Sequence, residues 1–128
     1  MITKEEMLNP ILVVSPDFSP VWNMLLSKRA GHKNSLPIYV ALTELARHIS
    51  QLHLNSRQEE ARKIFDIIES WHLEGDAYVH EAATSGLIED LQNSSIVGEG
   101  IPQQLASYLL PETRRWWEKS LNAWLKWK

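Results

Sequence analysis

The chain has 128 residues, of which 44% are apolar and 23% are charged, and its formal net charge is −3. These values are typical of one globular domain and exclude a disordered chain, while the lack of cysteine excludes disulfides and thiolate metal sites. The excess of acidic over basic residues argues against direct binding to nucleic acid. No apolar run is long enough to span a membrane, and the segment from Met1 to Glu6 lacks the apolar core of a signal peptide. We therefore expect a single helical domain over residues 1–128 that is cytoplasmic and contacts no membrane.

Capping residues and prolines predict the first helices. Thr3 and Glu6 have the spacing of a capping box, and the helix that they open should bend or end near Pro10. Ser15 and Ser19 each precede a proline, which is the pattern of a serine N-cap followed by proline at the first helical position.

A long amphipathic helix is predicted after a break near residues 31–35. Gly31 should stop the helix that begins near Ser19, and Ser35 should restart the chain. Apolar residues then recur at helical spacing, which predicts one buried stripe. The stripe consists of Ile38, Leu42, Leu45, Ile49 and Leu52.

The middle of the chain, Ser56 to Asn93, predicts two helices folded back on each other at Glu74-Gly75-Asp76. Ser56 and Glu59 form a second capping box. Gly75 should end the first helix in a left-handed conformation, and Asp76 should cap the second. The first helix should bury Ala61, Ile64, Phe65, Ile68 and Trp71 or His72, and the second Val79, Ala82, Ala83, Gly86 and Leu87.

The C-terminal third begins with a stretch, Asn93 to Gly100, that we expect to be mobile because periodicity ends there. Pro102 and Pro111 should each occupy the first position of a helix, the last of which runs almost to Lys128. No segment alternates strictly enough to predict a strand. The predicted fold is all-α, with six or seven helices in antiparallel pairs that form an irregular bundle or a short HEAT-like stack.

Charge is concentrated in the central hairpin. Between Glu59 and Asp90 nine carboxylates face only two bases, Arg62 and Lys63. The nine are Glu59, Glu60, Asp66, Glu69, Glu74, Asp76, Glu81, Glu89 and Asp90. A surface of net charge near −7 can select and steer a cationic partner, although charge runs also form ordinary solvated faces.

The residues most suited to partner binding on that surface are Glu74, Asp76, Glu81, Glu89 and Asp90. Structural roles are the alternative for three of them. Glu74 can simply end a helix, Asp76 can cap one, and Asp90 can bond to a helix packed at Gly86.

Tryptophan is the second unusual feature, with six residues in the chain and four on the last helix. These and their apolar neighbours span about 200° of the helix, wider than the roughly 100° stripe of a helix packed on one side. Either the helix lies deep between two neighbours, or part of it is exposed for a partner or for a second copy of the chain.

Motifs for catalysis and cofactor binding are missing. Glu69-x-x-His72 occurs once, whereas a di-iron bundle needs two such motifs, and His72 lies on the predicted buried stripe. Glu44 and His48 are one helical turn apart and could hold a metal only weakly. No Gly-x-Ser-x-Gly, phosphate loop or HExxH is present. We predict no catalytic residue, no enzyme activity, no cofactor and no metal.

Several motifs together resemble a family of small all-helical bacterial proteins without an assigned activity. They are Ser15-Pro-x-Phe18 with Trp22, Glu74-Gly75-Asp76, Glu89-Asp90-Leu91-Gln92-Asn93, and Leu110-Pro111-Glu112-x-x-x-Trp116-Trp117. Small acidic helical proteins of this kind are often immunity proteins of polymorphic or contact-dependent toxin systems.

The resemblance implies an inhibitor that neutralises a basic toxin domain, such as a nuclease, by tight stoichiometric binding. Two alternatives stay open: a helical adaptor that binds a peptide or helix in a groove, and a homodimer joined through the tryptophan-rich helix. The identity of the partner and the oligomeric state do not follow from the sequence.

Overall fold

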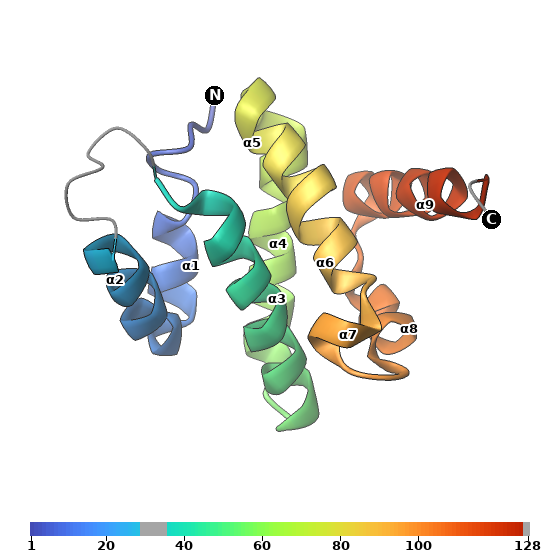
Figure 1. Ribbon diagram of the computed structural model, residues 1–128, viewed down its shortest axis with the longest axis horizontal. Coiled ribbons are helices and arrows are strands. Elements are labelled where there is room, and N and C mark those ends of the chain that lie inside the picture. Colours follow the sequence, from blue (N-terminus) through green and yellow to red (C-terminus); the bar gives the residue numbers. More distant parts are fainter. Residues whose placement is uncertain (29–35, 127–128) are drawn as a thin grey trace.

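The computed structural model describes residues 1–28 and 36–126 (Figure 1). The structure is 81% helical, and the described residues contain no strand, only an isolated parallel bridge between Ile2 and Gly75. The all-α prediction is confirmed. None of the described helices is long and apolar enough to cross a membrane.

The helices follow one another through short connections. The first half contains α1 (Asn9–Val14), a 3-10 turn (Pro16–Phe18), α2 (Ser19–Lys28), α3 (Ile38–Leu54) and α4 (Gln58–Glu74). In the second half, α5 (Ala77–Glu81), a π-helical segment (Ala82–Ile88) and α6 (Glu89–Leu91) form one continuous helix. The chain ends with α7 (Ser94–Val97), α8 (Ile101–Leu105), a 3-10 turn (Ala106–Tyr108) and α9 (Pro111–Lys126).

The antiparallel helices α3 and α4 occupy the centre of the molecule. In Figure 1, α1 and α2 lie on one side of this pair, and the continuous helix from α5 to α6 lies on the other, antiparallel to α4. Helix α9 packs against α4 and the π-helical segment near its beginning, then projects away from the body.

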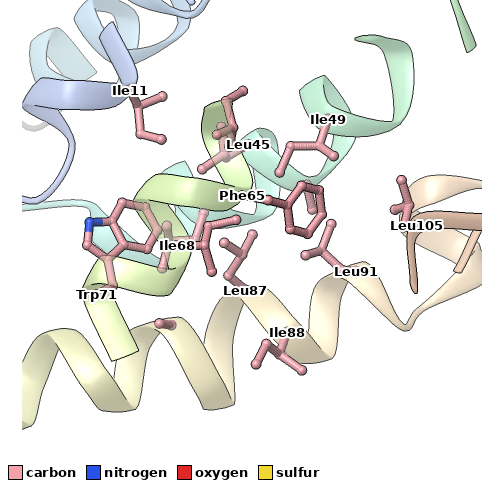
Figure 2. Packing of buried hydrophobic residues seen from close by; sticks show 14 of the residues in the cluster. Ile11, Leu45, Ile49, Phe65, Ile68, Trp71, Leu87, Ile88, Leu91 and Leu105 are labelled. Atoms are coloured by element: carbon pink, nitrogen blue, oxygen red, sulfur yellow. The ribbon is translucent and has the colours of Figure 1, made fainter. Parts of the chain in front are cut away.

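One core joins these helices. Both predicted stripes are buried as expected, including His72, which is only 6% exposed. Figure 2 shows Ile11 of α1, Leu45 of α3, Phe65 and Trp71 of α4, and Leu91 of α6 within this cluster. Because burying one such side chain contributes roughly 1.5–3 kcal/mol, the cluster supplies the main stabilising term of the fold.

The first capping box is confirmed in part, and the expected end of its helix is wrong. The backbone N–H of Thr3 donates to Glu6 Oε1 over 2.9 Å, but the residues that follow form turns. Helix α1 begins at Asn9 and contains Pro10 in its first turn, where a missing N–H costs nothing. Ser15 occupies the N-cap position of the 3-10 turn with Pro16 next to it, as predicted, but its buried hydroxyl bonds to His48 and Glu60 and caps no N–H.

The second capping box, Ser56 with Glu59, does not form. Ser56 has φ +62°, and the N–H of Arg57 donates to the carbonyl of Leu52, so Ser56 is the left-handed residue of a Schellman motif that ends α3. The Ser56 side chain therefore caps no helix, and α4 begins after Arg57 without a side-chain cap.

Gly75 is extended, with φ −71°, and not left-handed as predicted. Close packing, and not a left-handed backbone, explains why glycine occupies position 75. A Cβ there would overlap the carbonyl oxygen of Trp71 and lie 2.6 Å from Val79 Cγ1. The predicted cap at Asp76 is confirmed, since its carboxylate accepts from the N–H of Val79 over 2.9 Å.

The segment from Asn93 to Gly100 contains helix α7, which the sequence did not predict. Asn93 caps α7, and the carbonyl of Val97 accepts a 2.6 Å bond from Ser50 of α3. Pro111 is the first residue of α9 as predicted, whereas Pro102 is the second residue of α8 and not the first. The expected signals at Gly31 and Ser35 lie outside the described residues.

Candidate protein-binding site

The structure divides the nine carboxylates of the hairpin into structural and exposed groups. Glu59 forms a salt bridge with Arg62, and Glu60 forms one with Arg57. Asp76 caps α5. These interactions give each of the three a role within the fold, so Asp76 is a weaker candidate for partner binding than the other four predicted residues.

Glu69 has the most extensive structural role. Its carboxylate accepts from the backbone N–H groups of Glu112 and Thr113 over 2.9 and 2.8 Å, and from the Thr113 hydroxyl over 2.7 Å. Burial raises the pKa of Glu69, but these three hydrogen bonds outweigh that effect and hold it below its ordinary value. A side chain of α4 thus caps the first turn of α9 and fixes the direction in which α9 leaves the body.

The remaining predicted residues present charge to solvent. Glu74, Glu81 and Glu89 are exposed, and none forms an ion pair with another described residue. Asp90 is half-buried and accepts a 2.7 Å hydrogen bond from Thr43 of α3, as one of the structural alternatives anticipated. Gly86 packs beside it against α3, where a Cβ would lie 3.0 Å from the ring of Tyr39.

The five predicted residues do not form a single patch. Asp76 and Asp90 lie near opposite ends of one continuous helix, roughly 20 Å apart at the ordinary helical rise. Glu81 lies between them beside Tyr39, whose pKa is raised first by burial and then by the charge of Glu81. Only Glu89 and Asp90 are brought together at a concave surface.

That concave surface is a cleft of about 1050 Å³ between α6 and α9. The wall from the π-helical segment to α7 contributes Thr84, Ser85, Glu89, Asp90, Gln92, Asn93 and Ser94. The wall from α9 contributes Trp116, Lys119, Ser120, Leu121, Ala123 and Trp124, and Gln103 of α8 completes the lining. One wall is therefore polar and acidic, and the other is largely aromatic and apolar.

Gln92 holds the two walls together at the floor of the cleft. Its amide nitrogen donates to the carbonyl of Trp117 over 2.9 Å, and its amide oxygen accepts from the Ser120 hydroxyl over 3.0 Å. Gln92 belongs to the motif noted in the sequence, but only tertiary packing shows that it reaches α9. The lining residues Thr84, Gln103 and Ser120 carried no sequence signal.

The charges in the cleft are only partly neutralised. Burial and the neighbouring Asp90 raise the pKa of Glu89, as expected for a carboxylate near another negative charge without a cation beside it. On the opposite wall, the Lys119 ammonium lies 4.5 Å from the centre of the Trp116 ring. The Trp116 indole N–H donates to Glu112 over 3.2 Å, which fixes that ring against α9.

Helix α9 is neither buried along its whole length nor exposed along its whole length, so each of the two alternatives predicted for it holds for only one half. Trp117 is buried and Trp116 is half-buried, so the first half of the helix is packed. On the projecting half, Leu121 is 38% exposed, and Trp124 and Leu125 are each 57% exposed. The apolar residues in the first half of α9 therefore pack into the core, and those in the second half are exposed at the surface. Trp127 lies outside the described residues.

His72 is buried as predicted, but it is not fully satisfied, because its Nε2 is buried without a hydrogen-bond partner among the described residues. Its Nδ1 lies 3.1 Å from both the carbonyl of Ile68 and the hydroxyl of Thr113, and burial lowers its pKa to about 4. The ring of His80 packs edge-on against it and also contacts Trp116. Within residues 1–28 and 36–126, no three histidine, aspartate or glutamate side chains are placed to hold a metal ion.

A polar cluster that runs from the buried Ser15 to the surface, absent from the sequence predictions, joins α1, α3 and α4. The Ser15 hydroxyl donates to Glu60 and lies 2.6 Å from His48 Nε2, and Arg57 bridges Glu60 and Asp17. Because the Ser15 hydroxyl donates to Glu60, its oxygen can accept a hydrogen bond from the His48 ring. These contacts join the corner after α1 to the central helices α3 and α4.

The chain belongs to the family described as a domain of unknown function, DUF7674, whose model matches residues 8–125. No curated protein and no solved structure matches the chain. The matched span includes the whole acidic hairpin and both walls of the cleft. The family description assigns no activity, so the resemblance to immunity proteins stays a prediction.

Proposed function

We propose that this protein is a cytoplasmic inhibitor of the immunity type, which neutralises a basic toxin domain by stoichiometric binding. Acidic residues spread along the helix from α5 to α6 dock the partner: Glu81, Glu89 and Asp90 lie on this helix, and Glu74 lies just before it at the end of α4. Asp76 contributes mainly by capping α5. Inhibition comes from covering the partner's active site and involves neither a cofactor nor contact with nucleic acid or membrane.

The observation that carries this proposal is the exposure of Glu74, Glu81 and Glu89 without an ion pair among the described residues. The fold does not use these charges for its own stability. Charges arranged in this way accelerate association with a cationic domain and suppress binding to acidic ones. Nuclease domains fit this requirement because they bind phosphate backbones and tend to be basic.

The test compares three versions of the protein as baits for affinity capture from the native cells. In the first variant Glu74, Glu81 and Glu89 are replaced by glutamine, which neutralises the docking surface. In the second, which has the same net charge, the exposed residues Glu5, Glu99 and Glu118 are replaced by glutamine. The wild type and the second variant should retain one basic protein at equal molar amount, and the first variant should lose it.

The captured protein must then prove toxic when expressed alone and harmless when expressed with the wild type. A captured protein that is harmless by itself, or equal capture by all three baits, would contradict the proposal. Folding of each bait is checked by circular dichroism, which should show the same helix-dominated spectrum.

The projecting half of α9 favours a second candidate, a homodimer joined through this helix. Leu121, Trp124 and Leu125 form an exposed apolar surface of the kind that marks protein interfaces. The cleft beside it is also compatible with an adaptor that binds a peptide or helix.

Sedimentation and fluorescence quenching distinguish the dimer from the monomer. A dimer through α9 should dissociate when Trp124 is replaced by alanine, and acrylamide should quench Trp124 less as the protein concentration rises. Replacement of the exposed Leu54 on α3 is the matched control. A monomer at all concentrations with a quenchable Trp124 would remove the dimer.

A further inference from the structure

The cleft between α6 and α9 combines two features that the acidic surface alone does not have. Its walls differ in character, with Glu89 and Asp90 on one side and Leu121 and Trp124 on the other. Its volume of about 1050 Å³ is at the upper end of the range for ligand pockets, so it can receive several side chains at once. Such a site selects the chemistry of what enters it.

Three chemical classes can be compared as occupants. An anionic ligand would face two carboxylates at close range, with only Lys119 on the other wall. A purely apolar ligand would leave those carboxylates partly dehydrated without compensation. A cationic group that also carries an apolar surface meets the requirements of both walls.

Resting on the proposed function, we infer that the cleft receives an arginine-bearing segment of the partner polypeptide. The guanidinium group pairs with the Glu89 carboxylate, the charge of Asp90 nearby adds to the attraction, and an adjacent apolar side chain packs against Leu121 and Trp124. Arginine suits this site better than lysine, because its planar group can bond two carboxylate oxygens at once and lie flat along an aromatic wall.

The carboxylates are positioned for this role by the fold. The 2.7 Å hydrogen bond from Thr43 directs one oxygen of Asp90 to α3, while Glu89 has no hydrogen bond to another described residue and is the carboxylate available for pairing. Gln92 keeps the walls at a fixed separation through Trp117 and Ser120. The site is thus largely formed before the partner arrives, which reduces the entropy cost of binding.

The experiment uses a short capped peptide of alternating leucine and arginine, and a matched peptide in which neutral citrulline replaces each arginine. Binding is followed by nuclear magnetic resonance of the backbone amides and tryptophan indole N–H groups. The arginine peptide should shift signals of α6 and of α9 around Leu121 and Trp124. The citrulline peptide should bind about tenfold more weakly or not at all, as expected for losing a charged hydrogen-bonding group.

Two variants locate the effect. Glu89→Gln should remove most of the preference for arginine over citrulline without disturbing the fold, since Glu89 is exposed and bonds to no described residue. Glu5→Gln, at an exposed position outside both the cleft and the acidic docking surface, should leave the preference unchanged. The double variant with Asp90→Asn extends the test, and the single Glu89→Gln variant suffices if the double variant does not fold.

Equal binding of the two peptides, shifts confined to other surfaces, or an unchanged preference in Glu89→Gln would overturn this inference. None of these results would remove the proposed function, which depends on capture and neutralisation of the toxic protein. Conversely, a harmless captured protein would remove the proposed function even if the arginine peptide bound in the cleft.

Discussion

Individual residues of this protein often carry a role other than the one their sequence context suggests. Ser56 precedes a glutamate at capping-box spacing, yet it occupies a left-handed position that usually belongs to glycine. Gly75 has the sequence context of a left-handed helix stop, yet glycine is needed there because a Cβ would overlap the carbonyl oxygen of Trp71. In both cases the backbone conformation depends on where the following helix must go, which local sequence does not specify.

Replacing Ser56 by glycine should therefore stabilise the protein. Left-handed backbone costs a residue with a side chain on the order of 1 kcal/mol, and the Ser56 side chain makes no hydrogen bond to another described residue that would be lost. Urea denaturation should show a free energy of unfolding higher by about 1 kcal/mol for Ser56→Gly. Ser56→Ala is the control and should change little; a destabilised glycine variant would contradict the Schellman assignment.

His72 should make stability depend on pH. Its folded pKa of about 4 lies below the ordinary 6.5 because burial disfavours the charged form. Between these two pH values the imidazole of the unfolded chain binds a proton that the folded chain does not bind. The free energy of unfolding should therefore fall as the pH drops from 6.5 to about 4, and below pH 4 His72 should cause no further decrease.

The full effect is on the order of 3 kcal/mol, from about 1.4 kcal/mol for each pKa unit. Thermal unfolding of wild type and His72→Gln across this pH range measures it. The variant should lose most of the slope, although His48, whose pKa burial also lowers, retains a smaller share. Parallel curves for the two proteins would show that His72 is not the responsible group.

At the scale of elements, the long amphipathic helices were predictable and the connections were not. The stripes of α3 and α4 repeat at helical spacing, and every member is buried. Helix α7 was missed because its four residues depend on a bond between Ser50 and Val97, which are far apart in sequence. The π-helical segment is likewise invisible to a search that assumes 3.6 residues per turn.

The candidate site shows the same division. The sequence predicted an acidic helical hairpin and left open whether the aromatic surface of the last helix is exposed, but it did not predict that Glu89 and Asp90 face Trp124 across a cleft. That juxtaposition depends on Glu69 capping α9 and on Gln92 reaching Trp117. Neither contact has a local sequence signature, because each joins residues more than twenty positions apart.

Glu69→Ala should consequently loosen α9 more than the rest of the fold. It leaves two backbone N–H groups and the Thr113 hydroxyl without their acceptor, at a cost of about 2–3 kcal/mol. Hydrogen exchange should accelerate most in the first turns of α9. Asp66→Ala, on the exposed face of the same helix, is the control and should change neither stability nor exchange in α9.

At the scale of the whole molecule, one hydrophobic core lies beneath an outer surface that is charged and partly apolar. Helices α1 to α4 and the continuous helix from α5 to α6 share one core, while the end of α9 stands away from it (Figure 1). Substitutions of exposed residues on the outer surface should therefore change binding without unfolding the protein, which makes the proposed docking surface directly testable.

The most direct test is the association rate with the captured basic protein, measured by stopped flow for the two glutamine variants of equal net charge. Neutralising Glu74, Glu81 and Glu89 should slow association at low salt by about tenfold or more, and the difference should shrink at physiological salt, where charges are screened over about 8 Å. Neutralising Glu5, Glu99 and Glu118 should slow it far less. Equal association rates for both variants at low salt would contradict docking through the acidic hairpin.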